Sequence, residues 1–95
     1  MRIDRLIWDE WNIAHIARHN VSPEEVRQVC RSPERLVLRS SKSKHGLERY
    51  QVFGRTEEGR YLAMILDRLK PGQFYVVTAR DMSDREKKVY RRRRK

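Results

Sequence analysis

The first third of the chain has apolar residues at helical spacing. Five of them recur between residues 8 and 17, namely Trp8, Trp11, Ile13, Ile16 and Ala17. Asp9 stands where it can cap the first turn, so the pattern predicts a helix over residues 9–19. We expect this helix to end at Asn20, because asparagine is the best substitute for glycine in the left-handed conformation that ends many helices.

A second helix is predicted directly after the first. Ser22 and Glu25 have the spacing of a capping box, and Pro23 occupies the first helical position. Pro33 should end this helix, because the residue before a proline is pushed out of the α region. Its buried face is expected to consist of Val26, Val29 and Cys30.

After residue 35 the sequence changes to short segments rich in valine, leucine and aromatic residues between turn residues. These segments predict strands at residues 36–39, 49–53, 61–67 and 73–79. The connections are short, which favours antiparallel neighbours. Residues 61–66 are apolar throughout, so this strand is expected at the centre of the sheet with both faces covered.

A third helix is predicted at the C-terminus. Ser83 and Glu86 repeat the capping-box spacing, and the helix should continue through Tyr90. The predicted fold is therefore α+β, with two N-terminal helices, a four-stranded antiparallel sheet and a C-terminal helix. One domain is expected over residues 1–90, followed by a basic tail over residues 91–95.

Charge is the strongest feature of the composition. The chain has 95 residues and a formal net charge of +10, from 23 lysines and arginines against 13 acidic residues. Seven of the bases lie within residues 87–95, which contain no acid, so the remainder is only mildly basic. Such a cluster binds polyanions by counterion release, which favours RNA or DNA as a partner. Docking to an acidic protein, a solvated tail and a nuclear-localisation signal are the alternatives.

Three further observations bear on the compartment. The longest apolar run, residues 61–66, is far shorter than the roughly 20 residues of a membrane-spanning helix. The N-terminus has neither the apolar segment nor the cleavage site of a secretory signal. Cys30 is the single cysteine, so no intrachain disulfide can form. We therefore expect a cytoplasmic protein.

Motifs for metal or cofactor chemistry are weak. His15 and His19 are four residues apart, which places two imidazoles on one helix face as zinc sites require, but no third ligand is obvious. Cys30 falls on the apolar face of the second helix, which favours a buried structural thiol over a nucleophile. The sequence has no Gly-rich phosphate loop, nucleophile elbow or dinucleotide fingerprint. We therefore predict no cofactor and no metal site.

Cationic and proton-carrying side chains are scattered around the predicted sheet. They are His19, His45, Glu48, Arg49, Tyr50, Arg55, Arg60, Arg80 and Tyr90. Any one of them also fits a solvated surface position. Arg80 is the strongest candidate, because it lies at the end of the fourth predicted strand, just before a capped helix. We expect the tryptophan and phenylalanine side chains to lie in the core rather than to stack on bases. They are Trp8, Trp11, Phe53 and Phe74.

Several short motifs, in this order and spacing, resemble one family over nearly the whole chain. They are Trp8-Asp9-Glu10, Arg18-His19-Asn20-Val21-Ser22 with Glu24-Glu25, His45 with Glu48-Arg49-Tyr50, Gly54 with Gly59-Arg60, and Thr78-Ala79-Arg80 with Glu86 and Tyr90. The sequence is similar to the BrnT family of bacterial type II toxins, small ribonucleases with a RelE-like fold. It departs from the family pattern at Asn12, usually lysine, at Asn20, usually glycine, and at Thr78, usually serine.

The resemblance implies a toxin that cleaves RNA without a metal ion and inhibits translation. In this reaction the ribose 2′-hydroxyl attacks the neighbouring phosphate, which requires a base, an acid and cations around the phosphate. His19 or Glu48 is the candidate base, Arg49, Arg60 and Arg80 the phosphate clamp, and Tyr90 a positioning group or acid. The candidate RNA-binding residues are Arg55, Arg60, Arg91, Arg92, Arg93 and Arg94.

The resemblance also implies partners. These are RNA, free or bound to the ribosome, and an antitoxin that binds operator DNA and neutralises the toxin. The alternative function is a non-catalytic module that binds nucleic acid or the antitoxin. The absence of the usual lysine at Asn12 favours this alternative.

Overall fold

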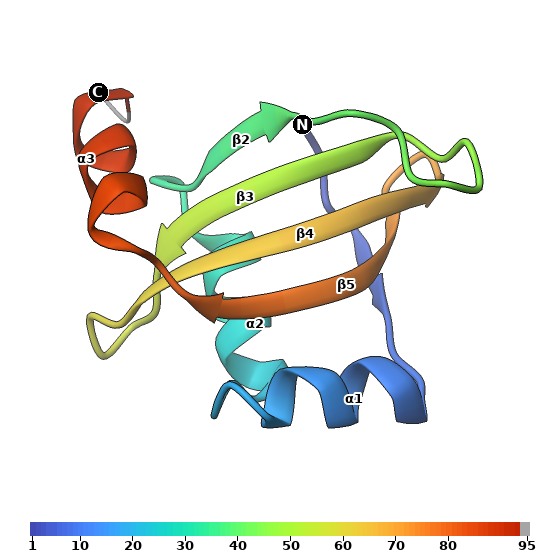
Figure 1. The fold of residues 1–95 in the computed structure, drawn as a ribbon, viewed down its shortest axis with the longest axis horizontal. Coiled ribbons are helices and arrows are strands. Elements are labelled where there is room, and N and C mark those ends of the chain that lie inside the picture. Colours follow the sequence, from blue (N-terminus) through green and yellow to red (C-terminus); the bar gives the residue numbers. More distant parts are fainter. Residues whose placement is uncertain (94–95) are drawn as a thin grey trace.

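The computed structural model describes residues 1–93 and contains a five-stranded sheet with three helices (Figure 1). The elements in chain order are β1 (Arg5–Ile7), α1 (Glu10–Ala17), α2 (Pro23–Arg31), β2 (Leu36–Arg39), β3 (Arg49–Arg55), β4 (Tyr61–Lys70), β5 (Gln73–Asp81) and α3 (Asp84–Arg93). The strand order is β1-β5-β4-β3-β2. The prediction of an α+β fold is confirmed, as is antiparallel pairing along β2, β3, β4 and β5.

Successive side chains of the central strands point to opposite faces of the sheet, and a separate core lies on each face. On one face the even-numbered residues of β4, such as Leu62 and Met64, form the main core with Ile16 of α1 and Val26 of α2. On the other face Ala63 forms a smaller cluster with side chains from β3 and α3. Helices α1 and α2 therefore cover one face, whereas α3 covers one end of the opposite face.

The prediction of four strands missed β1. This three-residue strand pairs in parallel with the beginning of β5, with Leu6 opposite Phe74. The sheet is therefore mixed rather than purely antiparallel. A strand of three residues is too short to show an alternating pattern, and its partner lies far away in the sequence.

Helix α1 is shorter and less buried than predicted. Asp9 caps it in a reciprocal capping box with Asn12, and the chain leaves the helix through Asn20 in the left-handed conformation (φ 58°), both as the sequence suggests. The helix itself ends at Ala17. Trp11, predicted to be in the core, is 82% exposed, because an eight-residue helix turns only part of its surface to the sheet.

Helix α2 follows the prediction closely. The Ser22 hydroxyl accepts a hydrogen bond from the Glu25 amide at 3.2 Å, and the helix ends one residue before Ser32-Pro33. Val29 packs so closely on β3 that a Cβ at Gly54 would lie 2.7 Å from its methyl carbon. Glycine at residue 54 therefore permits the close contact of helix and sheet.

Strand β4 lies at the centre of the sheet, as its apolar sequence predicts. Coverage of both faces is only partial, however, because Ile65 remains half-buried on the face that α3 leaves open.

Helix α3 begins with the predicted capping box of Ser83 and Glu86 but continues through Arg93, beyond the expected end at Tyr90. Arg94 of the predicted basic tail lies outside the described residues. No helix in the described part of the chain could cross a membrane.

Burial of Cys30 gives a test of the core. The thiol lies against the main core, and loss of solvent raises its pKa to about 12, although Arg35 and Arg31 act in the opposite direction. At pH 8 only roughly 1 thiol in 10,000 would then be ionised. We expect an aromatic disulfide reagent to label the native protein far more slowly than the protein in urea, as followed by absorbance. Equal rates in the two states would contradict this packing.

Candidate active site on the open sheet face

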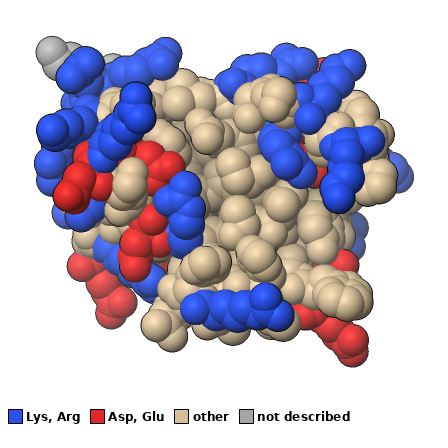
Figure 2. Space-filling model, in the orientation of Figure 1, with Lys and Arg blue, Asp and Glu red and all other residues tan. Residues whose placement is uncertain are grey.

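Within residues 1–93, one part of the sheet surface has no helix over it. Gln51, Ile65 and Thr78 lie side by side across β3, β4 and β5 on the face that α3 covers only at one end, and all three are half-buried. Figure 2 shows this open face as a central area of uncharged side chains, with basic side chains gathered over α3 and at the opposite end of the sheet.

A β-bulge in β5 decides which side chains reach the open face. Phe74 and Val76 point into the main core, and simple alternation would send Thr78 and Arg80 to the same side. The register shifts between Leu66 and Ile65, so that Val77 has no partner. The extra residue reverses the alternation, because a shift of one position turns every later side chain to the other face. Thr78 and Arg80 therefore face outward.

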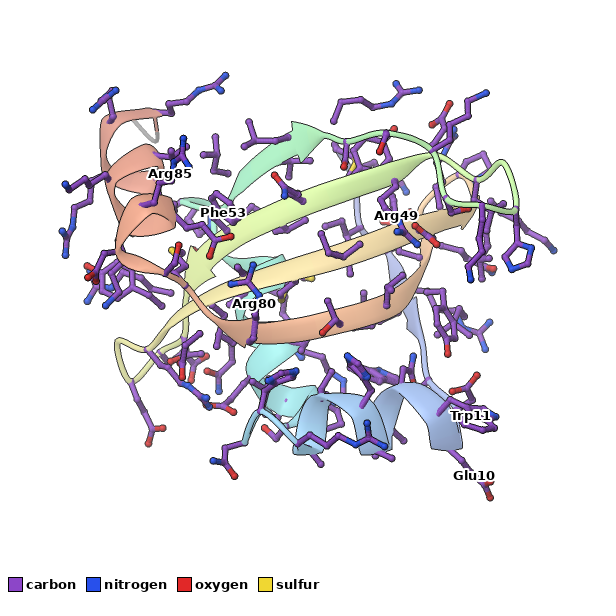
Figure 3. All side chains as sticks on the ribbon, in the orientation of Figure 1. Glu10, Trp11, Arg49, Phe53, Arg80 and Arg85 are labelled. Atoms are coloured by element: carbon purple, nitrogen blue, oxygen red, sulfur yellow. The ribbon has the colours of Figure 1, made fainter. Side chains whose placement is uncertain are left out.

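Arg80 is held on this face by a bidentate ion pair (Figure 3). Its Nη1 and Nη2 donate to the two carboxylate oxygens of Glu86 at 2.7 and 2.8 Å, and Nη1 also donates to the Asp81 carbonyl at 3.1 Å. Glu86 in turn accepts from the Ser83 amide at 2.9 Å, which ties the arginine to the first turn of α3. Nε–H and the second hydrogen of Nη2, which share one edge of the guanidinium, remain available to an anion.

The ion pair of Arg80 and Glu86 stabilises the charged form of both side chains. The Arg80 hydrogen bonds lower the pKa of Glu86, and Glu86 in turn raises the pKa of Arg80, because each charge stabilises the other. Arg80 is nearly half exposed and Glu86 is mostly buried. The carboxylate therefore orients the guanidinium, while part of the arginine side chain stays exposed to solvent.

Two histidines of α1 and its C-terminal turn lie at the edge of the open face near Arg80. His15 Nε2 is 3.0 Å from the Thr78 hydroxyl, two residues before Arg80 on β5. The rings of His15 and His19 meet edge to face with centroids 5.6 Å apart. From the sequence, His15 is a candidate only as a metal ligand. The four-residue spacing of His15 and His19 nevertheless indicates that the two rings lie on one side of the predicted helix, and the structure places them together. No group of three metal-ligating side chains occurs among residues 1–93.

Arg60 lies next to the two histidines, and its guanidinium is hydrogen-bonded to other groups of the protein. Its guanidinium donates to Asp81 at 2.8 Å, to Glu25 at 3.1 Å and to the backbone carbonyl of His19 at 3.0 Å. The bonds to Asp81 and Glu25 raise the pKa of Arg60, and the bond from Arg60 lowers the pKa of Asp81. Arg60 therefore ties the end of α1 to the sheet, and its guanidinium is engaged by protein groups.

Arg49 and Glu48 lie at the other end of β3. Arg49 forms a bidentate pair with Asp67, at 2.7 and 3.0 Å, on the open face (Figure 3). Across two strands and four register positions, it is roughly 16 Å from Arg80 between Cα atoms on ideal sheet spacings. The structure therefore does not bring Arg49 together with Arg80 and His19.

The Glu48 carboxylate is directed to the opposite side of the sheet. It accepts a hydrogen bond from the Tyr50 hydroxyl at 2.9 Å, and Tyr50 packs against the main core under α1 and α2. Arg68 donates to it at 3.2 Å and Arg39 lies at 3.4 Å. The Tyr50 bond, followed by the charge of Arg39, lowers the pKa of Glu48. Glu48 is thus the centre of a separate ion-pair network, away from the histidines.

Tyr90 of α3 is fully buried where the helix packs on the sheet. Its hydroxyl donates to the backbone carbonyl of Glu34 at 3.1 Å, and its ring meets Tyr61 edge to face. This placement gives the ring a packing role.

The predicted RNA-binding residues Arg55 and Arg91 both lie over Tyr61, at the end of the sheet that α3 covers. Arg92 and Arg93 are exposed in the last turn of α3.

The comparisons with known proteins agree with the resemblance found in the sequence. No curated protein matches the chain significantly. A family model, described as the ribonuclease toxin BrnT of type II toxin–antitoxin systems, matches residues 8–86. The match covers most of the chain, including both histidines, Arg80 and Glu86. The chain therefore belongs to the BrnT family of ribonuclease toxins, for which RNA is the substrate and an antitoxin is the partner.

Proposed function

We propose that this protein is a metal-independent endoribonuclease whose active site is the edge of the open sheet face around Arg80, and that its cleavage of RNA inhibits translation. The observation that supports the proposal most is the geometry of Arg80. Glu86 holds one edge of the guanidinium, and the edge with Nε–H and Nη2–H is left for two oxygens of a phosphate. A cation fixed in advance in this way stabilises the charge that builds up on the phosphate in the transition state.

The two histidines supply the proton transfers. One imidazole accepts the proton of the ribose 2′-hydroxyl as its oxygen bonds to phosphorus, and the other, as imidazolium, donates a proton to the departing 5′-oxygen. The products are a 2′,3′-cyclic phosphate and a 5′-hydroxyl. His19 is the exposed partner and our candidate base, while the Thr78 hydroxyl orients His15. Base, acid and cation are thus all provided by side chains.

Arg80 should be the most sensitive position of the site. We expect Arg80→Ala to lower the cleavage rate by on the order of 100-fold or more, as loss of a transition-state donor does in other enzymes. Arg80→Lys should restore little of the rate, because an ammonium group cannot grip two oxygens and Glu86 at once. The measurement is single-turnover cleavage of a mixed single-stranded RNA in EDTA, with mapping of the new ends.

The outcome also separates the two functions that the sequence left open. New ends with 2′,3′-cyclic phosphates, formed by the parent and not by Arg80→Ala, would support the ribonuclease. RNA that stays intact with the parent, both alone and with ribosomes, while still bound in a salt-dependent way, would favour the non-catalytic module.

His19 and Glu48 can be compared directly as candidate bases. Because Glu48 lies in the network on the other side of the sheet, Glu48→Gln should leave the cleavage rate close to that of the parent. His19→Ala should lower it by roughly 100-fold, the usual contribution of a general base. Single-turnover rates with the same RNA measure both variants. A loss confined to Glu48→Gln, in a protein that melts normally, would reverse the assignment.

The pair of Arg80 and Glu86 should affect the pH dependence of stability. The pKa of Glu86 is lowered in the folded protein, so its stabilising contribution is present above about pH 4.3, the ordinary glutamate value, and is lost as the pH falls through the lower folded value. Glu86→Gln should therefore melt below the parent at pH 7, and the difference should disappear near the bottom of the acid range.

The control is Glu58→Gln, at an exposed position in the turn between β3 and β4. Thermal melts followed by circular dichroism at several pH values measure both differences. A constant gap between Glu86→Gln and the parent at every pH would show that the ion pair does not contribute.

A further inference from the structure

Three cationic side chains gather around the ring of Tyr61. Arg55 of β3 lies 5.1 Å from the ring centroid, and Lys87 and Arg91 of α3 lie at 5.6 and 5.5 Å. The two α3 residues are four apart and so share one helix face. Figure 2 shows basic side chains gathered over α3, the helix that carries Lys87 and Arg91. We call Arg55, Lys87 and Arg91 the Tyr61 cluster.

The Tyr61 cluster differs from the three arginines of the predicted phosphate clamp in having no close ion pair within the described part of the chain, although the charge of Lys87 helps to lower the pKa of Asp81. Arg49, Arg60 and Arg80 are each paired with a carboxylate at 2.7 or 2.8 Å. Among residues 1–93, no member of the Tyr61 cluster forms an ion pair with an acidic side chain. The ring attracts each cation weakly, but three like charges around one ring repel one another. An anion bound among them would relieve this repulsion.

The position of the cluster relates it to Arg80. Tyr61 precedes Ala63 by two residues on β4, and Ala63 is the register partner of Arg80 on β5. On ideal sheet spacings the Cα atoms of Tyr61 and Arg80 are roughly 8 Å apart. Both side chains lie on the face opposite the main core. A single RNA strand held at Arg80 can therefore reach the Tyr61 cluster within a short distance.

We propose that the Tyr61 cluster is a second phosphate site, which binds the RNA backbone next to the phosphate that is cut. This inference rests on the proposed function and adds Lys87, which is not among the residues predicted from the sequence. RNA fits better than an acidic protein, because its backbone carries a charge at every nucleotide and must cross this face from Arg80. The family match ends at residue 86, so Lys87 and Arg91 lie beyond the part that the family model describes.

The test uses two matched double variants of α3. Lys87→Gln with Arg91→Gln removes two charges of the cluster, and Arg85→Gln with Lys88→Gln removes two exposed charges elsewhere on the same helix. Binding of a fluorescent single-stranded RNA is measured by anisotropy at several salt concentrations, in an Arg80→Ala background in which cleavage is expected to be slow. Thermal melts check that both variants fold.

We expect the cluster variant to bind the RNA about 10-fold more weakly at moderate salt. The slope of log affinity against log salt should become shallower by about 0.7 for each phosphate that the variant no longer neutralises. The control variant should keep the parent slope. Arg55→Gln, from a different element, should weaken binding in the same direction. Together these results would support a phosphate site at Tyr61.

Other outcomes would overturn the proposal. Equal losses of affinity in the cluster and control variants would show a general effect of helix charge rather than a site. An unchanged RNA slope, with weaker binding of polyglutamate as an acidic-protein probe, would assign the cluster to a protein partner. These results are independent of cleavage: if the parent binds RNA through the cluster but does not cut it, the proposed function fails while the phosphate site stands.

Discussion

The β-bulge at Val77 is the constraint on which the candidate site depends. Before the bulge, Phe74 and Val76 complete the main core with the helices; after it, Thr78 and Arg80 face the open side of the sheet. A regular strand would have buried Arg80 under α1 and α2, where an unpaired charge is strongly unfavourable. The same strand thus supplies both the core and the cation of the site.

The loops and helices around this strand hold the remaining groups in place. Arg60 binds the end of α1 to the sheet through the His19 carbonyl and Asp81, which determines where the histidine backbone lies. The contact of His15 with Thr78 then sets the position of the neighbouring ring. Asn12, which stands where the family usually has lysine, is buried in the cap of α1 and donates to the Ile7 carbonyl. That position supports the helix rather than a phosphate.

Much of the fold could be predicted from local signals, whereas most of the site could not. The caps at Asp9, Ser22 and Ser83 are each encoded within four residues, and the structure confirms all three. The short parallel strand β1 and the bulge both depend on pairing between distant segments, which no local pattern records. Arg80 could therefore be recognised from the sequence as a residue at a strand end before a capped helix. The sequence could not show which other candidate residues share its face of the sheet.

The separation of Glu48 from the histidines has the same cause. Glu48 directly precedes β3, and successive residues of an extended chain point to opposite sides, so Glu48 and Arg49 enter different networks. Their neighbours Tyr50 and Asp67 decide which network each enters, and these partners come from packing rather than from motif spacing. Motif residues taken in sequence order thus mix two networks that the sheet keeps apart.

The double use of Glu86 links the geometry of the candidate site to the local stability of one helix turn. The same carboxylate caps the start of α3 and orients Arg80, so fraying of that turn would release the arginine at the same moment. Helix ends open at a lower free energy than the core of a domain. A population of molecules with a frayed first turn would be folded yet have a disordered Arg80, so the order of the candidate site would be lost before the protein unfolds.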